Sequence, residues 1–134
     1  MNAIQNLTVL GSTGSVGANT LDVVERHPDR FRVLALTAHG KADVLFDQCL
    51  RHRPRYAVLA DADAAENLAR RARDSGLETE VLHGHEGLEL VAALPETDTV
   101  MAAIVGIAGL RATFAAAAAG KNCLLYTSPS PRDS

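Results

Sequence analysis

The chain has 134 residues, of which 47% are hydrophobic and 22% are charged, and its formal net charge is −3. This length and composition are typical of one globular domain with a buried core, and they argue against a disordered chain. The slightly acidic balance provides no general attraction to nucleic acid or to anionic membranes, so neither is expected as a partner.

Strand-like and helix-like segments alternate along the chain. In chain order, we expect a strand at residues 7–10, a helix at 15–26, a strand at 32–37, a helix at 42–53, a strand at 56–59, a helix at 61–75, a strand at 80–82, a helix at 86–94, a strand at 100–105 and a helix at 110–119. Five strands that alternate with helices predict right-handed βαβ units, and therefore an α/β fold with a Rossmann-like, doubly wound parallel sheet.

Residues 122–134 break this alternation. They begin like a strand and then become rich in serine and proline, which is typical of a disordered tail. The eleven residues from Cys123 to Asp133 also resemble the translation of a sequencing-library adapter. We therefore expect one domain over residues 1–121, truncated after the fifth strand and its helix, and a non-native tail over residues 122–134. Loss of a sixth strand would expose the sheet edge, so we expect marginal stability or aggregation.

Nothing in the sequence predicts export or membrane insertion. Residues 1–6 lack the basic and apolar regions of a signal peptide. The longest apolar run, residues 100–119, is rich in alanine and interrupted by two glycines and an arginine, so we do not expect it to span a membrane. Two cysteines are too few for a disulfide scaffold, and Cys49 fits a helical core position. A cytoplasmic location is expected.

A glycine-rich loop separates the first expected strand from the first helix. Gly11 allows a sharp turn, Gly14 allows a pyrophosphate to approach the backbone, and Gly17 allows close packing of the helix on the strand. The N–H groups at the start of the helix would face the phosphates, with the helix dipole behind them. The expected cofactor contacts in this loop are Gly11, Thr13, Gly14, Ser15, Val16 and Gly17. A purely structural glycine turn is the alternative.

The end of the second expected strand indicates which dinucleotide would bind. NAD sites usually carry an acidic residue there to hold the ribose 2′-hydroxyl. This chain has His39, Gly40 and Lys41 instead, with no acidic residue. Lys41, and His39 beside it, could receive a 2′-phosphate, so the sequence favours NADP(H). Alternatively, both are ordinary loop residues.

Other candidate sites are weaker. Residues 101–109 would form a small-residue turn at the end of a central strand, where a cofactor could lie against backbone, or they could be plain core packing. Residues 83–86 contain two histidines and a glutamate but no further obvious metal ligand. Asp61 and Asp63 fit a helix cap better than a pair of catalytic carboxylates. We therefore assign no catalytic and no metal-binding residue.

Several segments together resemble 1-deoxy-D-xylulose 5-phosphate reductoisomerase, an enzyme family of non-mevalonate isoprenoid biosynthesis. The matching segments are residues 10–17, 20–24, 31–36, 54–58, 101–106, 109–110 and 119–121. The resemblance implies that the full-length protein rearranges and reduces 1-deoxy-D-xylulose 5-phosphate to 2-C-methyl-D-erythritol 4-phosphate. It further implies NADPH, a divalent metal (Mg²⁺, Mn²⁺ or Co²⁺) and a homodimer. The family's NADPH contacts correspond to Thr13, Gly14, Ser15 and Val16, with residues 39–41 on the 2′-phosphate side.

The chain departs from this family after Lys121. The family continues through a strand to an Asn-Lys-Glu motif, whereas this chain has Tyr126, Thr127 and Ser128. The family's metal carboxylates, substrate-phosphate site and lid lie still further on. We therefore expect a cofactor-binding part that is inactive alone. The alternatives are part of a semialdehyde-type NADP dehydrogenase and a non-catalytic NADP(H)-sensing module.

Overall fold

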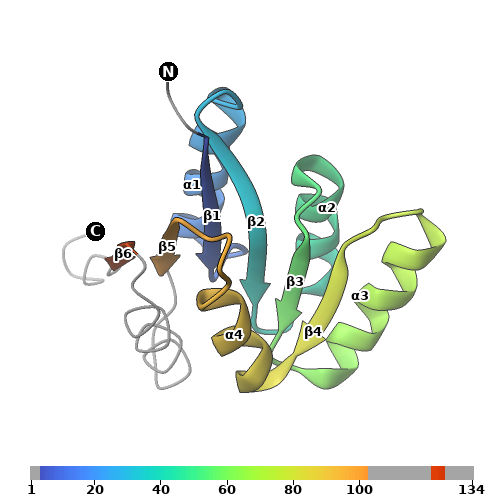
Figure 1. Ribbon diagram of the computed structural model, residues 1–134. Helices are drawn as coiled ribbons and strands as arrows, with labels where there is room; N and C mark the ends of the chain where they lie inside the picture. The colour runs from blue at the N-terminus through green and yellow to red at the C-terminus, as the bar shows by residue number, and fades with distance from the viewer. Residues whose placement is uncertain (1–3, 103–121, 126–134) are drawn as a thin grey trace, which may run out of the picture.

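The computed structural model describes residues 4–102 and 122–125. Within these residues, six strands form one sheet in the order β4-β3-β2-β1-β5-β6, and every neighbouring pair is parallel (Figure 1). The strands are β1 (Gln5–Leu10), β2 (Phe31–Ala38), β3 (Tyr56–Leu59), β4 (Glu80–His83), β5 (Thr99–Ala102) and β6 (Asn122–Leu125). The helices in this part of the chain are α1 (Ser15–Arg26), α2 (Ala42–His52), α3 (Ala62–Asp74) and α4 (Gly84–Ala92).

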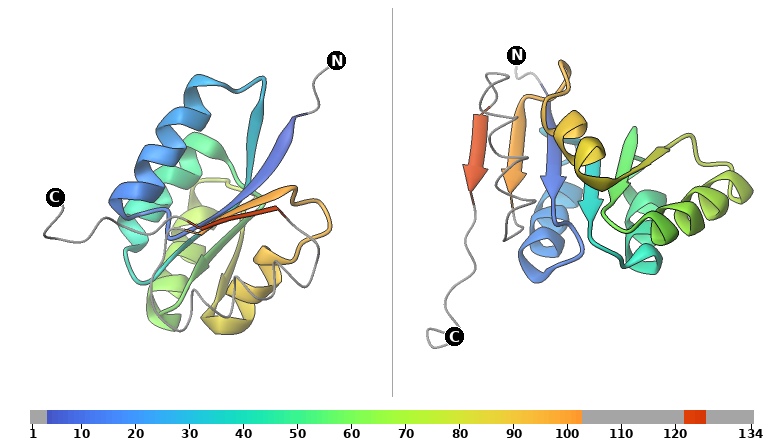
Figure 2. Two further views of the ribbon diagram at one scale, coloured as in Figure 1. Left: turned by 90° about the vertical axis from the view of Figure 1, so that its left-hand side faces the viewer. Right: turned by 90° about the horizontal axis from the view of Figure 1, so that it is seen from below.

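Helices cover both faces of the sheet (Figure 2). α1, α2 and α3 pack on one face, where the buried side chains include Val9, Leu45 and Leu68. α4 packs on the other face, where Leu10 and Val91 are buried. Because both faces are covered, the strands are apolar along most of their length rather than alternating with polar residues, as expected for a buried parallel sheet.

The order of the strands reverses at β1. The chain builds β2, β3 and β4 on one side of β1 and then returns to place β5 on its other side. At the carboxyl end of β1, Leu10 pairs with Thr37 of β2 and with Ala102 of β5. Ligands of open α/β sheets bind outside the carboxyl ends of the strands at such a reversal. This end of β1 is therefore the place to look for a site.

The predicted Rossmann-like parallel fold is confirmed, with differences at particular elements. The structure adds β6 in the segment expected to be a tail, where an apolar run at residues 123–125 pairs with the free edge of β5. α4 begins at Gly84 and ends at Ala92, two residues earlier at each end than expected. The helix expected at residues 110–119 lies outside the described residues.

The structure also bears on two minor expectations. Cys49 is buried in the core between α2 and the sheet, as the helical pattern predicted. Asp61 is the N-cap of α3, and one of its carboxylate oxygens accepts a hydrogen bond from the backbone N–H of Asp63 at 3.3 Å. Over residues 4–102 and 122–125, no helix combines the length and the apolar character that crossing a membrane requires.

Candidate functional site

The glycine-rich loop joins β1 to α1 at the reversal point of the sheet. Gly11 has a φ of +81°, a left-handed conformation that favours glycine. Its N–H lies 3.0 Å from both the carbonyl oxygen and the Oγ1 of Thr37, and the N–H of Ser12 donates to the same carbonyl at 2.8 Å. The start of the loop is therefore fastened to the carboxyl end of β2.

Gly17 is required by a close approach between α1 and the loop. A Cβ atom at this position would lie 2.3 Å from the Gly11 carbonyl oxygen and 2.5 Å from the Ser12 Cα. Both are backbone atoms and cannot move aside as a flexible side chain could. The sequence predicted close packing of the helix on the strand at Gly17, whereas the close contact is with the backbone of the loop.

Gly14 differs from its two neighbours in the motif. It is exposed, and a Cβ atom there would meet only the Gly11 carbonyl oxygen, at an ordinary 3.8 Å. Its φ of −79° and ψ of 173° are extended values open to any residue. Among the residues that the structure describes, none requires glycine at this position. The bare backbone at Gly14 therefore leaves room on the outer side of the loop.

The N-terminus of α1 has the features of an anion-binding end. Gly14 is the N-cap and has no side chain with which to bond the N–H groups of the first turn, and that turn contains no acidic residue. No carboxylate of the first turn therefore offsets the partial positive charge of the helix dipole. Thr13 is half-buried, and Ser15 and Val16 begin the helix.

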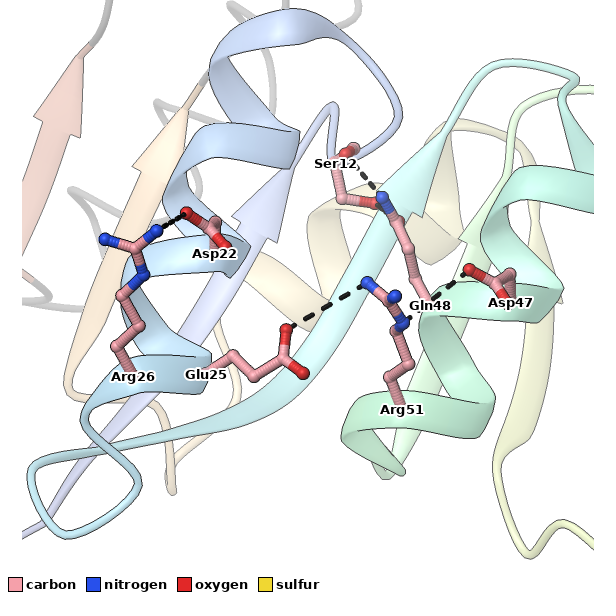
Figure 3. A network of polar contacts seen from close by, with 7 residues as sticks. All are labelled: Ser12, Asp22, Glu25, Arg26, Asp47, Gln48 and Arg51. Atoms are coloured by element: carbon pink, nitrogen blue, oxygen red, sulfur yellow. Dashed lines mark hydrogen bonds and ion pairs between the residues drawn. The ribbon is translucent and has the colours of Figure 1, made fainter.

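A buried polar cluster of Ser12, Thr37 and Gln48 supports the glycine-rich loop on its inner side, and the sequence did not predict it. Gln48 projects from α2 and forms two hydrogen bonds with Ser12 (Figure 3). Ser12 and Thr37 are fully buried, and Gln48 is 8% exposed. The available signal was a glutamine on the buried face of α2, between the core positions Leu45 and Cys49.

His39, Gly40 and Lys41 lie between β2 and α2, and all three are exposed. Their backbone is ordered by hydrogen bonds, because the His39 carbonyl accepts from the Asp61 N–H at 3.0 Å and the Gly40 carbonyl accepts from the Ala42 N–H at 3.1 Å. Lys41 is the N-cap of α2. The segment follows the strand that neighbours β1, so the fold places it at the same edge of the sheet as the glycine-rich loop.

A shallow hollow of about 430 Å³ adjoins this segment. Gly40 and Lys41 line it together with residues of α2 and α3. Two carboxylates, Asp43 and Asp63, also line it, and Asp43 forms an ion pair with Arg71 at 2.7 Å. Lys41 is the cationic side chain in this lining.

The remaining sequence candidates contribute less. β5 ends beside β1, but residues 103–109 of the expected small-residue turn lie outside the described residues. His83 and His85 are exposed near the start of α4. In the described part of the chain, no three His, Cys, Asp or Glu side chains are grouped as metal ligands would be.

A second hollow, of about 760 Å³, lies at the opposite edge of the sheet. Its lining includes Asn6, Arg32 and Arg55, which are at or next to the amino ends of β1, β2 and β3. Arg55 donates to Glu96 at 2.7 Å, and this pair is exposed to solvent. The amino ends of the strands are not where open α/β sheets bind their ligands, so this hollow is separate from the candidate site.

Comparisons with known proteins point to one family. The family model described as 1-deoxy-D-xylulose 5-phosphate reductoisomerase matches residues 7–126. A reductoisomerase of this name from Nitrosospira multiformis is 62% identical over 125 residues, which are 93% of this chain and 32% of that protein. A crystal structure of DOX-P reductoisomerase with magnesium superposes with a TM-score of 0.89 at 42% identity, covering 92% of this chain and 31% of the other. A second, with NADPH, fosmidomycin and magnesium, gives a TM-score of 0.86 at 42% identity, covering 90% and 29%. The chain thus spans about a third of the length of the curated relatives that it matches.

Proposed function

Because the chain belongs to the 1-deoxy-D-xylulose 5-phosphate reductoisomerase family, we propose that it forms the NADPH-binding part of an enzyme that converts 1-deoxy-D-xylulose 5-phosphate to 2-C-methyl-D-erythritol 4-phosphate. The observation that carries this proposal is the glycine-rich loop at the reversal point of the sheet, where the backbone favours glycine at Gly11, close packing requires it at Gly17, and no described residue requires it at Gly14. An exposed glycine that the protein does not need for its own packing fits the close approach of a pyrophosphate.

The pyrophosphate would lie on the N-terminal turn of α1. Its contacts would be the backbone N–H groups from Thr13 to Val16, with the hydroxyls of Thr13 and Ser15 as further donors. No side chain of the N-cap competes for these N–H groups, and no carboxylate of the first turn repels the phosphates. Bound there, NADPH supplies the hydride for the reduction, and the protein's part is to hold and orient it.

The 2′-phosphate would lie beside residues 39–41. Lys41 provides the positive charge, and the end of β2 provides no carboxylate of the kind that holds a free ribose 2′-hydroxyl. The adjoining hollow also contains the carboxylates of Asp43 and Asp63, so the positive charge that favours NADPH over NADH would have to come from Lys41, with His39 beside it.

In this proposal, other parts of the longer protein bind the substrate and the metal. The described residues contain no group of metal ligands, and a cofactor-binding domain alone cannot place hydride, metal and substrate together. We further propose that the longer protein is a cytoplasmic homodimer that uses Mg²⁺, Mn²⁺ or Co²⁺.

We also propose that residues 122–134 are a non-native tail to a domain of residues 1–121. The family match ends at residue 126, inside this segment, and β6 occupies its first four residues. Sequencing of the source DNA across this boundary tests the proposal, because a native coding sequence without adapter identity after Lys121 would refute it.

The test of cofactor binding is a titration of the chain with NADPH and with NADH, followed by nicotinamide fluorescence. We expect NADPH to bind more tightly, and we expect Lys41→Asp to weaken NADPH binding about tenfold or more while changing NADH binding little, since a hydrogen bond between charged groups contributes about 1.5–3 kcal/mol. Arg32→Asp is the matched control. It makes the same charge change at the amino end of β2, away from the site. Equal losses for both cofactors in Lys41→Asp would contradict the NADP(H) assignment.

A further inference from the structure

The amide of Gln48 is buried, and among the described residues both its oxygen and its nitrogen bond to one loop residue. Its Nε2 donates to the carbonyl oxygen of Ser12 at 2.9 Å, and its Oε1 accepts from the Ser12 hydroxyl at 2.7 Å (Figure 3). The two residues are 36 positions apart in the sequence. A carbonyl oxygen can only accept, so the nitrogen of the amide must face it, and the orientation of the glutamine is thereby fixed. Neither a carboxylate nor an apolar side chain of the same size could form both bonds.

These bonds determine how the peptide between Ser12 and Thr13 is oriented. The N–H groups of Gly11 and Ser12 are held by Thr37 of β2, and the carbonyl of Ser12 is held by Gln48 of α2. In a trans peptide the C=O and the next N–H point in opposite directions. Because the Ser12 carbonyl points toward Gln48, the N–H of Thr13 points away from α2. This N–H is the first of those assigned to the pyrophosphate.

The same glutamine joins the two ends of the proposed dinucleotide site. Lys41 is the N-cap of α2, and Gln48 lies seven residues further along that helix, which is about 10 Å along its axis. A helix moves as a rigid element over such a distance. The hydrogen bonds from Gln48 to Ser12 therefore fix the glycine-rich loop relative to the residues assigned to the 2′-phosphate.

We propose that Gln48 is a positioning residue for the dinucleotide. It orients the Ser12–Thr13 peptide toward the pyrophosphate and sets the spacing between the glycine-rich loop and Lys41. This inference rests on the proposed function, because it assigns a role to Gln48 in binding the same cofactor. Gln48 itself is buried beneath the loop and does not touch the ligand.

The experiment compares two ligands in three forms of the chain. NADPH spans both ends of the site, whereas adenosine 2′-monophosphate occupies only the end near Lys41. In Gln48→Met, which keeps the size of the side chain and removes both hydrogen bonds, we expect NADPH binding to weaken about tenfold. Binding of adenosine 2′-monophosphate should stay within about twofold of the unsubstituted chain, since the residues at its end of the site are unchanged.

The matched control is Thr8→Val. Thr8 is a buried polar residue whose hydroxyl donates to the Val91 carbonyl at 3.0 Å on the opposite face of the sheet. Its substitution also removes a buried hydrogen bond, but it does not touch the loop, so both ligands should bind as they do to the unsubstituted chain. If Gln48→Met does not fold, Gln48→Glu retains the acceptor for the Ser12 hydroxyl and removes only the donor to its carbonyl. The same selective loss of NADPH binding is then expected.

Two results would overturn the inference. The first is that Gln48 variants bind NADPH as tightly as the unsubstituted chain does. The second is that they lose both ligands in equal proportion, because that would indicate general destabilisation. Failure of the unsubstituted chain to bind NADPH at all would instead contradict the proposed function, and this inference with it.

Discussion

Substitution of Gly17 by alanine should destabilise the domain, and the expected size of the effect follows from the packing of α1. The added Cβ would lie 2.3 Å from the Gly11 carbonyl oxygen, 2.5 Å from the Ser12 Cα and 2.8 Å from the Ser12 carbonyl carbon. Ordinary contacts begin at 3.4 Å, so the backbone would have to move by about 1 Å. Overpacking of a core costs about 1–3 kcal/mol. We expect the upper part of that range, since all three atoms belong to the backbone.

Gly14→Ala is the informative comparison. Its Cβ would lie 3.8 Å from the Gly11 carbonyl oxygen, and its backbone is extended. The free energy of unfolding should therefore fall by no more than about 1 kcal/mol, the typical cost of placing alanine at a helix N-cap. NADPH binding should nevertheless weaken, because the new methyl group would stand on the outer side of the loop where we place the pyrophosphate.

Urea denaturation of the two variants measures stability, and nicotinamide fluorescence measures binding. Gly17→Ala should lose both stability and binding, whereas Gly14→Ala should lose mainly binding. The reasoning is refuted if both variants lose the same free energy of unfolding, or if Gly17→Ala is as stable as the unsubstituted chain.

Three further predictions concern the core, the titration of a thiol and activity. Thr8→Val should lower the free energy of unfolding by about 1–2 kcal/mol, because the Thr8 hydroxyl contacts both the Val91 carbonyl and the Thr97 hydroxyl at 3.0 Å; urea denaturation that shows no loss would contradict this. Burial raises the pKa of Cys49 from 9.0 to about 12. Between those pH values the thiol loses its proton in the unfolded chain but keeps it in the folded chain. The stability that the buried thiol provides below pH 9 therefore declines as the pH rises. The stability difference between the unsubstituted chain and Cys49→Ala should therefore shrink over this range, and a constant difference would count against the assignment. Finally, the chain alone should not oxidise NADPH in the presence of 1-deoxy-D-xylulose 5-phosphate and Mn²⁺, and a measurable decrease in nicotinamide absorbance would show that it needs no further residues.

Much of the fold could be predicted because its signals are local. Each buried strand is a short apolar run, each helix has an apolar face and a Gly or Pro near its end, and their alternation leaves few topologies open. β6 was harder to predict, because its residues are followed at once by a Ser/Pro-rich stretch and its pairing depends on the free edge of β5.

The candidate site was predicted less completely, for physical reasons. The spacing of the glycines locates the loop, but the same residue type serves different needs at Gly11, Gly14 and Gly17, and only the surrounding atoms distinguish them. The contacts of Gln48 with Ser12 could not be predicted, since they depend on how α2 lies against the loop. A polar residue on a helix face gives no indication of its partner when that partner is 36 residues away.

The position of β1 also affects the order in which the domain can assemble. β2, the first neighbour of β1, follows it through a single helix, whereas its other neighbour β5 is far away in the sequence, with Asn6 bonded to Asp98 at a separation of 92 residues. Closing a longer chain loop costs more conformational entropy, so pairings between distant segments form later. We therefore expect the unit of β1 to β4 to gain protection from hydrogen exchange during refolding before β5 does. The side of β1 that later pairs with β5 would then stay unpaired until β5 has been synthesised and has docked beside it.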